Sequence, residues 1–137
     1  GIKSVRPADI FKSECDVFCP CAFNNVITEE NASQIRCKVI AGSASNPVKS
    51  LEAQKILESN KILVLPGFMI NTGEIVQVSN ELSKDSQEKT EEELKVIYYT
   101  MLGILQTAKE KKESPTSIAL KMADEYIKNV SMVKMLK

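Results

Sequence analysis

Four cysteines are the residues of this sequence whose types and spacing could first suggest chemistry. Cys15, Cys19 and Cys21 crowd into one short stretch, and Cys37 follows further along the chain. Structural zinc sites usually use two well-separated pairs, with about two to four residues between the members of each pair. These cysteines instead leave gaps of three and then one residue, with a lone fourth member. The spacing therefore favours thiols packed as small hydrophobic side chains over a metal site, and we expect no metal ligands here.

The absence of histidine removes several chemistries from this sequence. Without an imidazole there is no histidine base, no Ser/His/Asp or Cys/His nucleophile pair and no histidine metal ligand. The phosphate-binding turn G-x-G-x-x-G is also missing from the sequence. Lys38, Lys61 and Asp16 stand in no pattern that would make any of them a general base. The sequence therefore assigns no catalytic residue.

Composition excludes two classes of partner. The 137 residues carry 18 basic and 18 acidic side chains, so no electrostatic footprint for nucleic acid is visible. Aromatic residues make up 5% and tryptophan is absent, which argues against a base-stacking surface. No apolar run approaches the roughly 18 residues that a membrane-spanning helix needs, and no export signal is recognisable. We expect a soluble intracellular chain, in the cytoplasm or an organelle matrix, without disulfides.

The first half of the chain alternates apolar runs with helical patterns. Strands are predicted at residues 15–21, 37–41 and 61–66, and helices from Thr28 to about Ile35 and, capped by Ser50, over residues 50–57. This alternation predicts parallel β-α-β units, whose ligands bind at the carboxyl ends of the strands. The loops at residues 20–25, 42–46 and 67–73 are therefore the candidate site.

The second half predicts helices. One begins within residues 74–81, and a polar connection spans 83–90. A long helix capped by Thr90 then extends to Lys112, and another covers residues 115–134. Each long helix carries an apolar stripe that we expect to pack, formed by Leu94, Ile97, Met101, Ile104, Leu105 and Ala108 in the first and by Ala119, Ala123, Ile127 and Val130 in the second. We predict an α/β chain with three parallel strands followed by two long helices, divided after residue 82.

Three sequence blocks then carry a resemblance to a known family. They are residues 14–23 (ECDVFCPCAF), residues 37–46 (CKVIAGSASN), and Leu65-Pro66 with Ile70-Asn71-Thr72-Gly73. In this order and at these separations they resemble the carboxyl-terminal half of the glutamate, leucine, phenylalanine and valine dehydrogenases, and the leucine dehydrogenases most closely. The flanking residues and the final helices fit as well, so the likeness extends over nearly the whole chain.

The resemblance implies a fold, a cofactor and a reaction. Residues 1–82 would be the second half of a Rossmann-type NAD-binding domain, and residues 83–137 a helical segment packed on it. The whole enzyme would oxidise an L-amino acid to an imine by hydride transfer and release ammonia as the 2-oxo acid forms. By position, Cys21 and Ala22 would pass beside the ribose and nicotinamide, Ser45 and Asn46 would hold the carboxamide and the reacting end of the substrate, and Asn71 and Gly73 would close the pocket.

Departures from the family pattern support an alternative, a degenerate and non-catalytic module that serves structure or interaction. Asn24, Ser45, Gly67 and Glu74 stand where the family usually has Gly, Asn, Asp and Gly. The family's catalytic lysine and aspartate belong to an amino-terminal domain outside this sequence. A three-stranded partial sheet also leaves an open edge. We expect the missing amino-terminal half or another subunit to pair with it, within an oligomer.

Overall fold

The computed structural model describes residues 1–22 and 24–135, with side chains described as far as residue 130. Phe23, part of the predicted loop at residues 20–25, lies outside the described residues. The chain divides into two compact units, Gly1–Asn71 and Thr72–Lys137. This division comes before the α4 helix (Thr72–Ser83), whereas the boundary expected from the sequence comes near its end. The difference arises because α4 packs on the helix that follows it.

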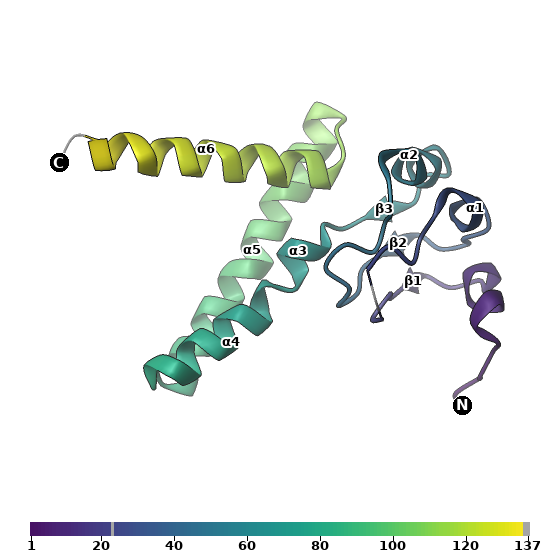
Figure 1. Ribbon diagram of the computed structural model, residues 1–137, viewed down its shortest axis with the longest axis horizontal. Coiled ribbons are helices and arrows are strands. Elements are labelled where there is room, and N and C mark those ends of the chain that lie inside the picture. The colour runs from purple at the N-terminus through teal and green to yellow at the C-terminus, as the bar shows by residue number, and fades with distance from the viewer. Residues whose placement is uncertain (23, 136–137) are drawn as a thin grey trace. The chain divides into compact units, whose positions relative to one another are not determined.

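The first unit contains a parallel three-stranded sheet. Its elements are the 3-10 helix η1 (Pro7–Lys12), β1 (Val17–Phe18), α1 (Glu29–Ala32), β2 (Val39–Ile40), α2 (Leu51–Ser59), β3 (Leu63–Val64) and α3 (Gly67–Ile70) (Figure 1). The strand order is β1-β2-β3, and Val39 pairs with both Val17 and Leu63. The predicted α/β fold with three parallel strands is therefore confirmed. The regular strands are shorter than the predicted runs, since Pro20 and Pro66 have no N–H to extend the pairing.

Helices α1 and α2 pack on each other and enclose the core of this unit. Ser50 caps α2 as predicted, because its Oγ accepts a hydrogen bond of 3.1 Å from the Ala53 N–H. The core combines residues of both helices with residues of the strands and their approaches: Ile27, Ala32, Ile35, Ile40, Ala53, Leu57, Ile62 and Val64. Packing against these helices therefore fixes the strands, and a loop follows each strand at its carboxyl end.

The second unit is helical, with α4 packed on α5 (Gln87–Lys111) and α5 packed on α6 (Pro115–Met135). The prediction that Thr90 caps α5 is wrong. Ser86 caps it, because its Oγ accepts a hydrogen bond from the Lys89 N–H at 3.2 Å. Thr90 lies one turn inside the helix, buried, where its hydroxyl accepts a bond of 3.0 Å from the Asn80 Nδ2 of α4.

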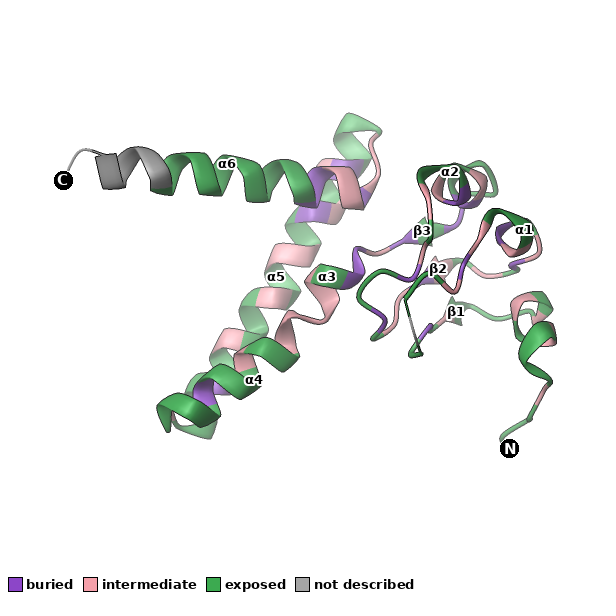
Figure 2. Cartoon of the chain, in the orientation of Figure 1, coloured by how far each residue is buried: buried purple, intermediate pink, exposed green. Residues whose placement is uncertain are grey.

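The apolar stripes pack only in part. Ile104 and Ala108 of α5 are buried, as are Ile118 and Ala119 at the start of α6. From Leu120 to Val130, however, every residue of α6 is exposed (Figure 2). The predicted packing of Ala123, Ile127 and Val130 therefore does not occur within the described part of the chain. None of the described helices has the length and hydropathy required to cross a membrane.

Candidate functional site at the carboxyl ends of the strands

Gly42 brings the loops after β1 and β2 into direct contact. A Cβ at this position would lie only 2.3 Å from the Pro20 carbonyl oxygen, and the Pro20 N and C atoms would also be closer than 3 Å. The same carbonyl accepts a hydrogen bond of 2.9 Å from the Ala44 N–H. Only glycine permits this approach of two backbones, so residue 42 positions the two predicted site loops against each other.

Asparagine residues extend the contact between these two loops. The Asn24 Oδ1 accepts a bond of 3.1 Å from the Asn46 N–H, and the Asn25 N–H donates to the Asn46 carbonyl at 2.8 Å. Asn25 has a φ of 62°, a left-handed conformation that asparagine adopts more readily than most residues. Asn24, which replaces a family glycine, therefore has a structural role in the loop.

The third loop joins the same edge through Gly67 and Asn71. A Cβ on Gly67 would lie 2.5 Å from the carbonyl oxygens of both Ala44 and Ser45. The Asn71 Nδ2 donates to the Ser43 carbonyl at 2.6 Å and approaches the Ser45 Oγ at 3.3 Å. Gly67 is thus required by this packing, which explains why a larger residue is absent there. Residues 67–73 are not an open loop, because α3 and the start of α4 occupy most of them.

The six residues predicted to contact a cofactor do not all lie in one unit. Cys21, Ala22, Ser45 and Asn46 are exposed on the first two loops, and Asn71 is half-buried beside Ser45. Gly73 belongs to the second unit, inside α4, where a Cβ would lie 3.2 Å from the Leu94 Cδ2 of α5. Packing between two helices is therefore sufficient reason for a glycine at position 73.

Glu74 does not place an unpaired charge in a core, because its side chain is exposed. A charge buried there without a partner would cost several kcal/mol, about the penalty of an unpaired polar group in a core, and the exposure of Glu74 avoids this cost.

Ser43 is a residue of this edge that the sequence reasoning did not single out. Its backbone N–H and its hydroxyl donate hydrogen bonds to the Cys21 sulfur, and these bonds lower the pKa of the Cys21 thiol below its usual value. Its carbonyl also accepts the bond from Asn71. The feature of the sequence that could have identified Ser43 is the run of small residues in the loop after the second predicted strand. The edge offers hydroxyl, amide and thiol groups that can orient a polar ligand, without a paired acid and base.

The cysteines are more exposed than predicted. Cys15, Cys19 and Cys21 are exposed and only Cys37 is half-buried, so the expected packing of the first three is wrong. The reason is that β1 is an edge strand of the three-stranded sheet. Within residues 1–22 and 24–135, no group of three or more cysteines and carboxylates is arranged to hold a metal ion.

Comparisons with known proteins show which proteins this chain resembles. Leucine dehydrogenase of Thermoactinomyces intermedius is 35% identical over 127 residues, which is 93% of this chain and 35% of that protein. The leucine dehydrogenase of Geobacillus stearothermophilus is 34% identical over 131 residues, 95% of this chain and 35% of its own. The crystal structure of L-tryptophan dehydrogenase from Nostoc punctiforme superposes with a TM-score of 0.84 at 29% identity, covering 93% of this chain and 39% of that one.

This chain thus spans about a third of the length of the curated relatives it matches. The family model for glutamate/leucine/phenylalanine/valine dehydrogenases matches residues 1–134, almost all of the sequence. Together with the parallel sheet, this match confirms the resemblance found in the three sequence blocks. The chain belongs to the glutamate/leucine/phenylalanine/valine dehydrogenase family.

Proposed function

We propose that this chain is the cofactor-binding part of an NAD-dependent amino-acid dehydrogenase of the leucine type, which converts an L-amino acid to a 2-oxo acid. The observation that carries this proposal is the meeting of three loops at the carboxyl edge of the sheet, held by Gly42, Gly67 and Asn71. Ligands of parallel sheets bind at this edge. Membership of a dehydrogenase family supports the same conclusion.

The groups at this edge fit one end of a dinucleotide. Ser45, Asn46 and Cys21 are exposed and polar, which suits hydrogen bonds to a ribose and a carboxamide. The glycine-rich turn that would receive the pyrophosphate is absent from the sequence. When bound, NAD would supply the acceptor for the hydride that leaves the amino-acid α-carbon. The role of this chain is to hold and orient the nicotinamide end, and Ser43 supports that role by positioning Cys21 and Asn71.

The proposal includes a partner for the sheet. β1 pairs only with β2 among the described strands, so its other side is an open edge. We propose that the amino-terminal half of the family enzyme, or another subunit of an oligomer, adds a strand there and brings the pyrophosphate turn and the catalytic lysine. An edge strand left open would otherwise be prone to association with other chains.

One observation favours a second candidate, a degenerate module without cofactor. The Asn46 N–H and the Asn71 side-chain amide already have acceptors within the protein, Asn24 and Ser43. Ser45 and Gly67 also replace larger polar residues of the family. A module that retained only the packing of these loops would keep both glycines and would not bind NAD.

Titration of NADH fluorescence against the purified chain separates the two candidates. The cofactor-binding proposal predicts a saturable change, and Ser45→Asn, which restores the family residue, should lower the Kd. Lys55→Ala on the exposed side of α2 is the matched control and should leave the titration unchanged. If the NADH fluorescence change is not saturable with the native chain or with Ser45→Asn, the result would favour the degenerate module and contradict the cofactor-binding role of this chain.

A further inference from the structure

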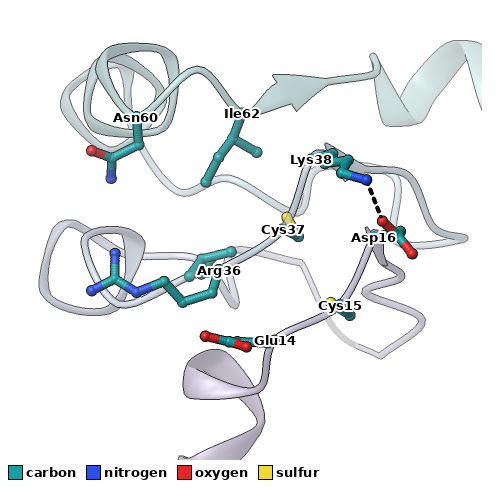
Figure 3. A pocket seen from close by; sticks show the side chains of 9 residues that line it. Glu14, Cys15, Asp16, Arg36, Cys37, Lys38, Asn60 and Ile62 are labelled. Atoms are coloured by element: carbon teal, nitrogen blue, oxygen red, sulfur yellow. Dashed lines mark ion pairs between the residues drawn. The ribbon is translucent and has the colours of Figure 1, made fainter.

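A concave surface lies at the amino ends of the strands, where the chain enters them. It is an open hollow of about 590 Å³. Side chains from the approaches to all three strands line it, and Figure 3 shows two thiols among them, those of Cys15 and Cys37. No residue of the candidate cofactor edge contributes to this hollow. The thiols are therefore separate from the carboxyl-edge loops.

The strand register places these two cysteines side by side. Glu14 pairs with Arg36 on one side of them, and Val17 pairs with Val39 on the other, both in parallel orientation. Cys15 and Cys37 hold equivalent positions between these pairings. Neighbouring strands lie about 4.8 Å apart, and disulfides join Cα atoms separated by about 4.4–6.8 Å. The backbone positions therefore suit a bond between the two sulfurs.

The surroundings of the thiols support this closeness. Burial raises the pKa of Cys37, and the neighbouring Cys15 raises it further, whereas hydrogen bonds from the backbone N–H groups of Phe18 and Val39 act in the opposite direction. Since Phe18 belongs to β1, the Cys37 sulfur lies close to this strand, and Cys15 is in the segment that leads directly into it. Burial also raises the pKa of Cys15, assisted by Asp16 and Cys19. Both thiols therefore have a smaller thiolate fraction at neutral pH than an ordinary cysteine.

We propose that Cys15 and Cys37 form a reversible thiol–disulfide site on this chain, oxidised by a low-molecular-weight disulfide such as oxidised glutathione. The deprotonated sulfur of the exposed Cys15 attacks glutathione disulfide and forms a mixed disulfide, releasing one glutathione thiolate, which takes up a proton. The deprotonated Cys37 sulfur then attacks the Cys15 sulfur and releases the second glutathione. Two protein thiols lose two protons and two electrons, and one glutathione disulfide becomes two thiols. In a reducing compartment such a bond is transient and responds to redox conditions.

Peptide mapping after incubation with oxidised glutathione tests this site. The chain is digested with trypsin and with a protease that cleaves before aspartate. This digestion separates the peptide Ser13–Cys15 from the peptide that holds Cys19 and Cys21, and it releases the dipeptide Cys37–Lys38. We expect a linked Ser13–Cys15/Cys37–Lys38 product and two remaining free thiols of the original four. Because a rising pH deprotonates both thiols, the initial rate should increase about tenfold per pH unit between pH 7 and 8.

Variants show whether the pairing is specific. The double variant Cys19→Ser/Cys21→Ser should still form the link, and Cys15→Ser should lose it and retain far-UV circular dichroism like that of the native chain. Cys37→Ala, which leaves no polar group in the half-buried position, should also lose the link. Bonds that involve Cys19 or Cys21, glutathione that stays attached to Cys15, or no oxidation of the double variant would each overturn the proposal.

Discussion

Replacing Gly42 by alanine tests the close approach that holds the site loops together. The added Cβ would lie 2.3 Å from the Pro20 carbonyl oxygen, whereas ordinary contact begins at 3.4 Å, so one loop must retreat by about 1 Å. That retreat breaks the 2.9 Å bond from the Ala44 N–H to Pro20, at about 1 kcal/mol. Overpacking strain of about 1–3 kcal/mol adds to it, for a total of about 2–4 kcal/mol.

This cost is smaller than the roughly 5–15 kcal/mol that stabilises a typical domain, so we expect the loops to separate before the chain unfolds. Hydrogen exchange measured by mass spectrometry reports the separation directly. The Ala44 amide should exchange about thirtyfold faster or more, the factor that corresponds to about 2 kcal/mol. Gly103→Ala is the matched control, because nothing lies within 4 Å of a Cβ there. It should stabilise α5 by about 0.5–1 kcal/mol and leave the exchange of Ala44 unchanged.

The reasoning fails if Gly42→Ala leaves the Ala44 amide protected as in the native chain. Such a result would mean that the loops after β1 and β2 are not in contact at Pro20. The argument that Gly42 positions the candidate site would then lose its basis.

Three further changes test other parts of the structure. Asn80→Ala removes the buried bonds to Thr90 and Glu93 and should cost about 1–3 kcal/mol, measured by thermal unfolding with tyrosine fluorescence; a change below about 0.5 kcal/mol would contradict this role. Ser50→Ala should cost about 1 kcal/mol at neutral pH. The Ser50 hydroxyl also lowers the pKa of Glu29. Part of the stability difference between the native chain and Ser50→Ala should therefore vanish when acid protonates the Glu29 carboxylate, which urea titrations at about pH 7 and 3 would measure. An equal stability difference at both pH values would refute this coupling between Ser50 and Glu29. Oxidation of the proposed thiol pair should raise the unfolding free energy by about 3 kcal/mol, and urea midpoints that are equal with and without reductant would argue against the bond.

Local signals in the sequence were sufficient to predict the sheet unit. Apolar runs flanked by small residues and proline identified all three strands, and Ser50 three residues before Ala53 identified the start of α2. These features depend on residues close together in the chain, such as a hydroxyl and a nearby N–H. The sequence therefore predicted the three strands and the helices α1 and α2 in their observed order, but not η1 or α3.

Features that depend on distant residues were not predictable in the same way. Ser86 and Thr90 both suit a helix cap, and the choice of Ser86 leaves Thr90 free to accept a bond from Asn80 on another helix. Cys15 was expected to pack because it begins the run predicted as a buried strand, yet it is exposed beside an edge strand. In both cases the outcome depends on which other element covers the residue, and one sequence does not contain that information explicitly.

The glycines of the candidate site illustrate why loop geometry alone does not distinguish its two functions. Gly42 and Gly67 are required by contacts between backbones of the protein itself, so a cofactor-binding chain and a degenerate module would both keep them. Ser45 differs, because its side chain is exposed and its hydroxyl accepts a hydrogen bond from the Asn71 side-chain amide. Substitution there changes the groups offered to a ligand without disturbing the close approaches of Pro20 and Ala44. A change in NADH affinity at position 45, with loop protection preserved, would therefore report ligand binding rather than folding.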